Sequence, residues 1–153
     1  MPVLSSIQVI RHGFRTFRLE AHDHYSEDSA FVSSYRVEVQ RRDGEDGPDL
    51  WEVSLHYQFG AKEGEQTGPY DGEIVVEGLF WIRPTFPEEK KESLARMNGG
   101  AVLLGAIREA VLNHTIRSMN GPLELPLVDA RSFLPESERQ IPLIPSRQAD
   151  SDE

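Results

Sequence analysis

The first 82 residues alternate between apolar and polar side chains, as β-strands do when one side is buried and the other faces solvent. The clearest run is WEVSLHYQF (residues 51–59), in which every second residue is apolar. The same alternation runs through RTFRLEAH (15–22) and FVSSYRVEVQR (31–41), whereas YDGEIVVEGLFWI (70–82) is apolar on both sides. The pattern predicts an antiparallel sheet of four strands in a meander.

Breaks in the alternation predict where the strands turn. DGEDGPD (43–49) and GAKEGEQTG (60–68) are polar and rich in glycine, so both are expected to be hairpin loops. Gly13 lies within a long first strand, where we expect it to mark a β-bulge.

The periodicity then changes from two to that of a helix. RPTFPEEKKES (83–93) carries two prolines and predicts an exposed crossover. A helix is expected from about Leu94, with Gly121 and Pro122 as its stop signal. Apolar residues spaced by three, four and seven positions form its main stripe: Leu103, Leu104, Ile107, Ala110, Val111 and Thr115. The fold class predicted is therefore α+β, with one long helix packed on one face of the sheet.

A second apolar patch lies about half a turn away from that stripe, at Leu112, Ile116 and Met119. A helix that is apolar on two sides must bury both of them. The sheet can cover one side only. We therefore expect the second side to meet another subunit, a client polypeptide or a ligand.

The periodicity fades after Asp129, where the chain is interrupted by prolines. A short helical turn is expected around residues 132–134, followed by a mobile tail. The sequence thus predicts one domain over residues 1–134 and a tail over residues 135–153.

Composition narrows the choice of partners. The formal net charge is −10, which argues against nucleic acid or an anionic membrane as the main partner. The chain has no cysteine, so disulfides and thiolate chemistry are excluded. No apolar run approaches the length of a membrane span, and the first residues lack the layout of a signal peptide. A cytoplasmic location is the default expectation.

Side chains that could perform chemistry are few. His22, Asp23 and His24 are close enough in sequence to suggest a metal site, but a solvated strand end is the simpler interpretation. His114 is expected at the edge of the core, hydrogen-bonded rather than catalytic. No nucleotide-binding or hydrolase motif is present, and no cofactor is expected. An enzyme would be favoured only by a deep polar pocket around His114 or His56.

The order of these segments resembles the SecB family of export chaperones. The resemblance rests on GEIVVEGLFWI (72–82), AVLLGAIREAVLNHTIRSMNG (101–121) and LELPLVDARSF (123–133), with weaker support from IQVIRHGFRTFRLEA (7–21). It covers residues 5–134, nearly the whole predicted fold.

The resemblance implies a homotetramer, a dimer of dimers with the sheets outside and the long helices between subunits. It also implies an ATP-independent holdase that binds unfolded preproteins in apolar grooves and passes them to the motor SecA. Six residues are candidates for client binding: Phe80, Trp81, Phe86, Leu112, Ile116 and Met119.

The family's acidic patch for SecA maps onto Glu20 and Glu73, with two further positions at Thr16 and Asp71. Thr16 is not acidic, and Asp71 replaces an apolar residue. The chain also departs from the family after residue 134, because PESERQIPLIP cannot continue as the helix that SecB has there. An alternative role is an adaptor for one dedicated partner, such as the antitoxin of a toxin–antitoxin system.

Overall fold

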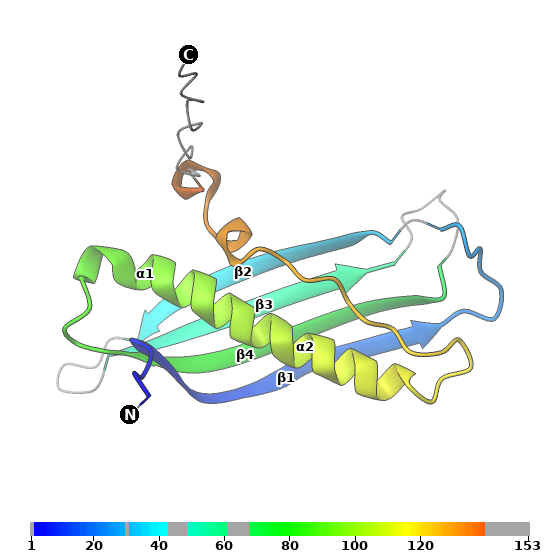
Figure 1. The fold of residues 1–153 in the computed structure, drawn as a ribbon, viewed down its shortest axis with the longest axis horizontal. Coiled ribbons are helices and arrows are strands. Elements are labelled where there is room, and N and C mark those ends of the chain that lie inside the picture. The colour runs from blue at the N-terminus through cyan, green and yellow to red at the C-terminus, as the bar shows by residue number, and fades with distance from the viewer. Residues whose placement is uncertain (1, 30, 43–48, 61–67, 140–153) are drawn as a thin grey trace, which may run out of the picture.

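A computed structural model describes residues 2–29, 31–42, 49–60 and 68–139. It contains a four-stranded antiparallel sheet with one long helical unit across one face (Figure 1). The predicted fold class is thereby confirmed. The strands are β1 (Ile7–Ala21), β2 (Ser33–Arg42), β3 (Leu50–Phe59) and β4 (Tyr70–Ile82). Most of both predicted hairpin loops, residues 43–48 and 61–67, lies outside the described residues.

The order of the strands across the sheet is β1-β4-β3-β2. The strands β2, β3 and β4 form a meander as predicted, but β1 lies beside β4 instead of β2. This is the strand arrangement of a Greek key, in which one long connection lets an end strand return beside the far one. The connection from β1 to β2 (residues 22–32) is long enough to cross the end of the sheet.

Alternation along the strands separates two faces of the sheet. In β3 the odd-numbered residues from Trp51 to Phe59 are buried beneath the helix, while Glu52, Ser54 and His56 point to the opposite face. The opposite face, which none of the helices in the described ranges covers, is called the outer face below.

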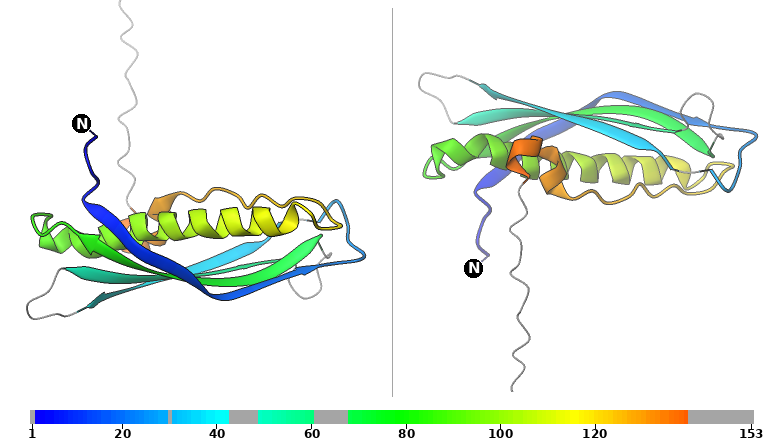
Figure 2. Two further views of the ribbon diagram at one scale, coloured as in Figure 1. Left: turned by 90° about the horizontal axis from the view of Figure 1, so that it is seen from below. Right: turned by 90° about the horizontal axis from the view of Figure 1, so that it is seen from above.

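The strand β1 is irregular at two points. Its register with β4 shifts between Val9 and Arg11 and again between Phe14 and Thr16. Gly13 pairs regularly with Glu77, so the bulge predicted at Gly13 is wrong in its position. Extra residues in a strand bend it and increase its twist. Accordingly β1 curls out of the sheet toward the helix side near its N-terminal end (Figure 2).

The helical unit begins earlier than predicted. After the crossover, a 3₁₀ turn (Glu88–Lys90), α1 (Lys91–Leu94), a π-helical stretch (Ala95–Gly99) and α2 (Gly100–Thr115) follow one another without a break. The early start is fixed by Lys91, whose side chain is buried and lies 2.7 Å from Asp49 and 2.9 Å from Glu88. The α-helix ends at Thr115, and turns continue to Gly121, which takes a positive φ of 79°.

The core lies between α2 and the sheet. Leu103, Ile107 and Val111 are fully buried there, which confirms the main apolar stripe. After the helix, residues 122–128 run extended beside α2, where the Arg108 Nε donates to the Leu125 carbonyl at 2.8 Å.

Two 3₁₀ turns follow, Ala130–Phe133 and Glu136–Glu138. The first lies close to the helical turn predicted around residues 132–134, and it buries Phe133. Residues 140–153 of the predicted mobile tail lie outside the described residues, and the domain boundary at residue 134 stays a prediction.

Candidate functional site

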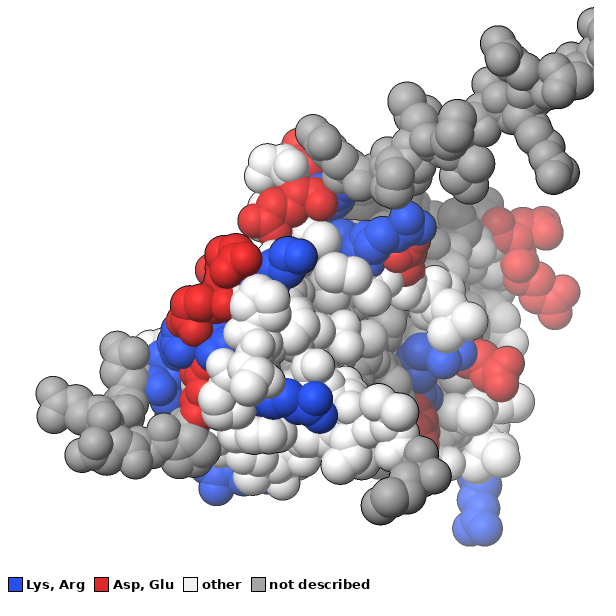
Figure 3. Space-filling view, turned by 60° about the vertical axis from the view of Figure 1, so that its left-hand side comes forward, with Lys and Arg blue, Asp and Glu red and all other residues white. Residues whose placement is uncertain are grey.

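Exposed large apolar side chains gather on the helix side of the molecule. On the outer face, by contrast, Val75 and Trp81 are half-buried and Leu79 is buried. We call the following seven residues the helix-side apolar surface: Val9, Phe14, Val102, Leu112, Ile116, Met119 and Leu127. In Figure 3, which brings the crossover end forward, uncharged residues form a broad area with acidic side chains mostly toward its margins.

The outward side of α2 forms the centre of this surface. Ile116 at the end of the helix is 59% exposed, and Met119 in the following turns is 97% exposed. Leu112 is half-buried, and Val102 is exposed four turns before Ile116. Within the described residues, Ile116 and Met119 of this second apolar patch therefore stay open to solvent.

The strand β1 extends the surface because α2 crosses the sheet obliquely (Figure 1). Phe17 is covered by His114, whose ring centroid lies 4.6 Å from that of Phe17. Phe14 lies edge-on to Phe17 with centroids 5.7 Å apart but remains exposed, as does Val9. The N-terminal half of β1 thus turns apolar side chains toward the helix side without a helix above them.

Small side chains line the helix next to this uncovered part of β1. Ala110 and Ala106 lie one and two turns before His114, on the same side of α2. Both are only partly buried. Toward its N-terminal end, the side of α2 that bears His114 therefore carries small apolar side chains.

The six predicted client-binding residues do not form one patch. Leu112, Ile116 and Met119 share the helix-side apolar surface. Phe80 is 1% exposed and belongs to the core, Trp81 points to the outer face, and Phe86 is half-buried against the core. The sequence reasoning missed Val9, Phe14, Val102 and Leu127. Helical spacing from Ile116 could have indicated Val102, but no periodicity indicates which strand the helix leaves open.

The predicted acidic patch is gathered at one corner of the outer face. Glu20 lies opposite Asp71 in the register of β1 and β4, and Glu73 is the next outward residue of β4. A histidine lies beside Asp71 and another beside Glu73, although Asp71 Oδ1 accepts no hydrogen bond within the described residues. The Nε2 of His22 lies 3.3 Å from Asp71, and the Nε2 of His56 lies 3.1 Å from Glu73.

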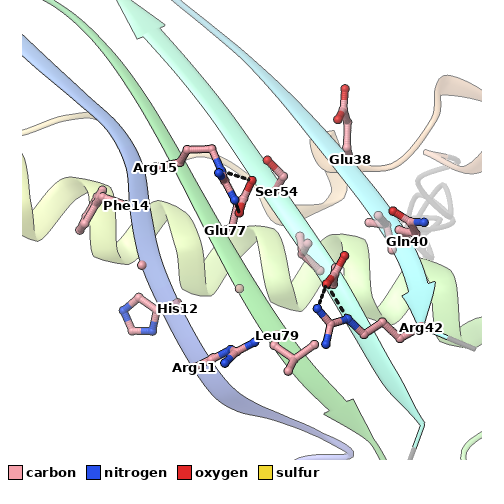
Figure 4. Close-up of a pocket in the computed structure, with 15 residues that line it drawn as sticks. Arg11, His12, Phe14, Arg15, Glu38, Gln40, Arg42, Ser54, Glu77 and Leu79 are labelled. Carbon is pink, nitrogen blue, oxygen red and sulfur yellow. Dashed lines mark hydrogen bonds and ion pairs between the residues drawn. The ribbon is translucent and has the colours of Figure 1, made fainter. Parts of the chain in front are cut away.

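The rest of the outer face is a broad concavity of about 1060 Å³ across all four strands (Figure 4). Arg15 donates to both carboxylate oxygens of Glu77 at 2.7 Å, and this pairing lowers the pKa of Glu77. Arg42 donates to Glu52 at 2.6 Å. The carboxylates of this concavity are thus largely matched by arginines of the same sheet.

The histidines considered above for catalysis or metal binding make contacts of an ordinary structural kind. His114 Nδ1 lies 2.7 Å from the Ala110 carbonyl, and its ring covers Phe17. Within residues 2–29, 31–42, 49–60 and 68–139, no three potential ligand side chains gather into a metal site around His22 or elsewhere. No helix in this part of the chain is both long and apolar enough to cross a membrane.

Comparison with known proteins supports the fold. No protein-family model matches the sequence, and no curated protein matches it either. The structure is similar to the Mycobacterium tuberculosis SecB-like chaperone Rv1957, solved in complex with a ChAD peptide from the Rv1956 HigA1 antitoxin. The two are 16% identical with a TM-score of 0.53, over 80% of this chain and 91% of that chain.

A protein of unknown function from Streptococcus agalactiae is also similar, at 13% identity and a TM-score of 0.43, over 79% of this chain and 97% of that chain. The likeness to the mycobacterial chaperone shows that this chain has a SecB-like fold. Membership of the SecB family itself stays a prediction.

Proposed function

We propose that this protein is an ATP-independent chaperone that holds non-native polypeptides on its helix-side apolar surface. One observation carries the proposal: the second apolar side of the helix, with Ile116 and Met119 exposed, is left uncovered by the part of the chain that the structure describes. The SecB-like fold is consistent with this role.

Burial of apolar surface supplies the binding energy in this proposal. Removing apolar area from water is worth roughly 25 cal/mol per Å², so a few hundred Å² gives several kcal/mol before ordering costs. Side chains such as Phe14 and Met119 adapt to varied client sequences, because neither requires a hydrogen-bonding partner. The net charge of −10 keeps such a surface soluble.

A second candidate is an adaptor that binds one dedicated partner. The specific support is that the mycobacterial neighbour was solved with a peptide from an antitoxin. An antitoxin segment would occupy the same helix-side apolar surface here. In this version selectivity comes from exposed charged groups beside the apolar side chains, such as Glu109 and Arg117.

The resemblance to SecB adds two further elements to the proposal. One is a cytoplasmic homotetramer, a dimer of dimers with the long helices between subunits, in which part of the helix-side apolar surface is interface and part receives the client. The other is docking of SecA or a similar basic partner at Glu20, Asp71 and Glu73. Docking there competes with the contacts that His22 and His56 already make.

Suppression of aggregation tests the proposed function. Two unrelated unfolded proteins are diluted from denaturant without nucleotide, with and without this protein, and light scattering is recorded. Wild type should protect both clients, while Ile116→Ser/Met119→Ser should lose most of the protection. The matched control is Thr16→Ser/Gln40→Ser on the outer face, which should protect like wild type.

The pattern of protection separates the candidates. If neither client is protected, the proposal of a general holdase is wrong. In that case a dedicated adaptor predicts that isothermal titration finds one antitoxin-like peptide that binds wild type and not Ile116→Ser/Met119→Ser.

A further inference from the structure

Residues 2–6 form an arm ahead of β1 that is held at its base and exposes two apolar side chains beyond it. The base is held because Arg83 N donates to the Ser6 carbonyl at 2.8 Å, and the Gln8 side chain donates to the Ser5 carbonyl at 3.0 Å. Val3 and Leu4 beyond it are 97% and 67% exposed. The arm therefore offers two apolar side chains from a defined point.

The direction of the arm follows from the irregularities in β1. The register shifts around Ile10 and Arg15 bend the strand toward the helix side. Both views in Figure 2 show the first residues continuing past the helix layer, away from the sheet. A folded partner that packs on the outward side of α2 is therefore expected to lie next to the arm.

We propose that the arm clasps a second copy of this chain, with Val3 and Leu4 buried on the partner when two helix layers face each other. This inference rests on the proposed assembly with helices between subunits and adds a contact to it. In a two-fold arrangement each copy gives one arm and receives one, so every arm contact occurs twice.

Charge favours a second copy as the occupant. Two chains of net charge −10 repel each other and can approach only where carboxylates are few. Glu109 is the one carboxylate within α2, and Arg108 is its neighbour in the sequence. The outward side of α2 therefore carries little charge to oppose a like-charged copy.

The number of apolar side chains left exposed when no client is bound also favours a second copy as the occupant. The arm, β1 and α2 together expose Val3, Leu4, Val9, Ile10, Phe14, Val102 and Ile116. A client covers apolar residues only while it is bound. A stable assembly keeps them covered at all times, as the apolar interfaces of obligate oligomers do.

Site-specific photocrosslinking tests the contact directly. A benzophenone amino acid replaces Val3, and the protein is mixed with an isotopically heavy wild-type copy before irradiation without client. Mass spectrometry should find the probe joined to residues 101–119 of the heavy chain. The same probe at Thr16, on the outer face, should give no such product. Crosslinks confined to the light chain that carries the probe, or none at all, would overturn the inference.

Self-association provides the second measurement. Sedimentation equilibrium of Val3→Ser/Leu4→Ser should show a dissociation constant raised at least about tenfold. Tyr25→Ser, which removes an exposed aromatic residue outside the arm, should leave it unchanged. An unchanged constant in the arm variant, or a monomeric wild type, overturns the arm contact. Client protection is scored separately, so the holdase proposal stands or falls on its own result.

Discussion

The two faces of the molecule differ in how far their side chains find partners within the chain. On the outer face, charged groups are paired within the sheet, as Arg15 with Glu77 and Arg42 with Glu52. On the helix side, Ile116, Met119 and Leu127 stay exposed although they are apolar. The outer face is thus largely complete in the single chain. The helix side leaves apolar side chains exposed, and that is why we assign client binding and self-association to it.

The same contrast exists within α2 alone. Ile107 is fully buried against the sheet, while Val102 is exposed on the side that faces away. Both residues are β-branched and aliphatic, so their helix propensities are similar. Comparing them separates what the helix contributes to folding from what it offers to a partner.

The largest effect is expected from Ile107→Ala. It leaves a cavity between α2 and the sheet and should lower the free energy of unfolding by about 2–5 kcal/mol. Urea denaturation followed by circular dichroism measures the loss. Val102→Ala is the matched control and should change stability by about 0.5 kcal/mol or less. Equal losses at low protein concentration would mean that both sides of the helix are core, and the contrast would fail.

The sequence predicted the side of α2 that packs on the sheet because burial there is local and periodic. Leu103, Ile107 and Val111 repeat at helical spacing, and every one is buried. The position of β1 was harder to predict, since the alternation of a strand says which side is buried but not which strand lies next to it. Pairing of Phe17 with Ile74 follows from the long connection at residues 22–32, which no local pattern encodes.

The candidate site was predicted in part for a related reason. Ile116 and Met119 stood out because they break the polar character expected of a solvent-facing helix side. Phe80 was nominated as an aromatic residue at the end of the last strand, but its alternation in β4 places it in the core. Val9 and Phe14 could not be nominated, because their exposure depends on the oblique path of α2 across the sheet.

A smaller loss of stability is expected from Thr115→Val. The Thr115 hydroxyl donates to the Val111 carbonyl at 2.8 Å and accepts from the Leu123 N–H at 2.8 Å, so it ties the extended segment to the helix. Valine keeps the volume but leaves that N–H without its acceptor, at a cost of about 1–3 kcal/mol. Thermal unfolding measures the change. Thr16→Val on the outer face should be close to neutral; if it is as damaging as Thr115→Val, the hydroxyl bridge is not the cause.

An acid-dependent effect is expected from Glu88, which joins the crossover to the sheet through Arg41 and Lys91. These partners lower the pKa of Glu88 from 4.5 to about 2. A depressed pKa contributes stability that is present above pH 4.5 and is lost as the pH falls toward about 2. Unfolding midpoints across this range should therefore fall less steeply in Glu88→Gln than in wild type.

Glu89→Gln is the control for that measurement, because it removes the neighbouring exposed carboxylate. It should retain the steep wild-type slope. The same flattening in both variants would show that the overall negative charge, and not the contacts of Glu88, governs the acid response.

The smallest effect is expected from the ion pair of Arg15 and Glu77 on the outer face. The two groups make a bidentate contact, but their side chains are 69% and 44% exposed. Water and salt screen such a pair, and ordering two long side chains opposes the attraction. Arg15→Ala, Glu77→Ala and the double variant should therefore share the urea midpoint of wild type within error.

A double-mutant cycle at low and at high salt makes this test strict, since any coupling between Arg15 and Glu77 should vanish at high salt. A large coupling that survives high salt would mean that the outer face holds the fold together through its ion pairs. The two faces would then differ in chemistry but not in their share of the folding energy. If the coupling vanishes at high salt, the outer face is a solvated surface whose ion pairs add little to the folding energy. Stability then comes mainly from the core between α2 and the sheet, while the apolar side chains on the outward side of α2 remain exposed.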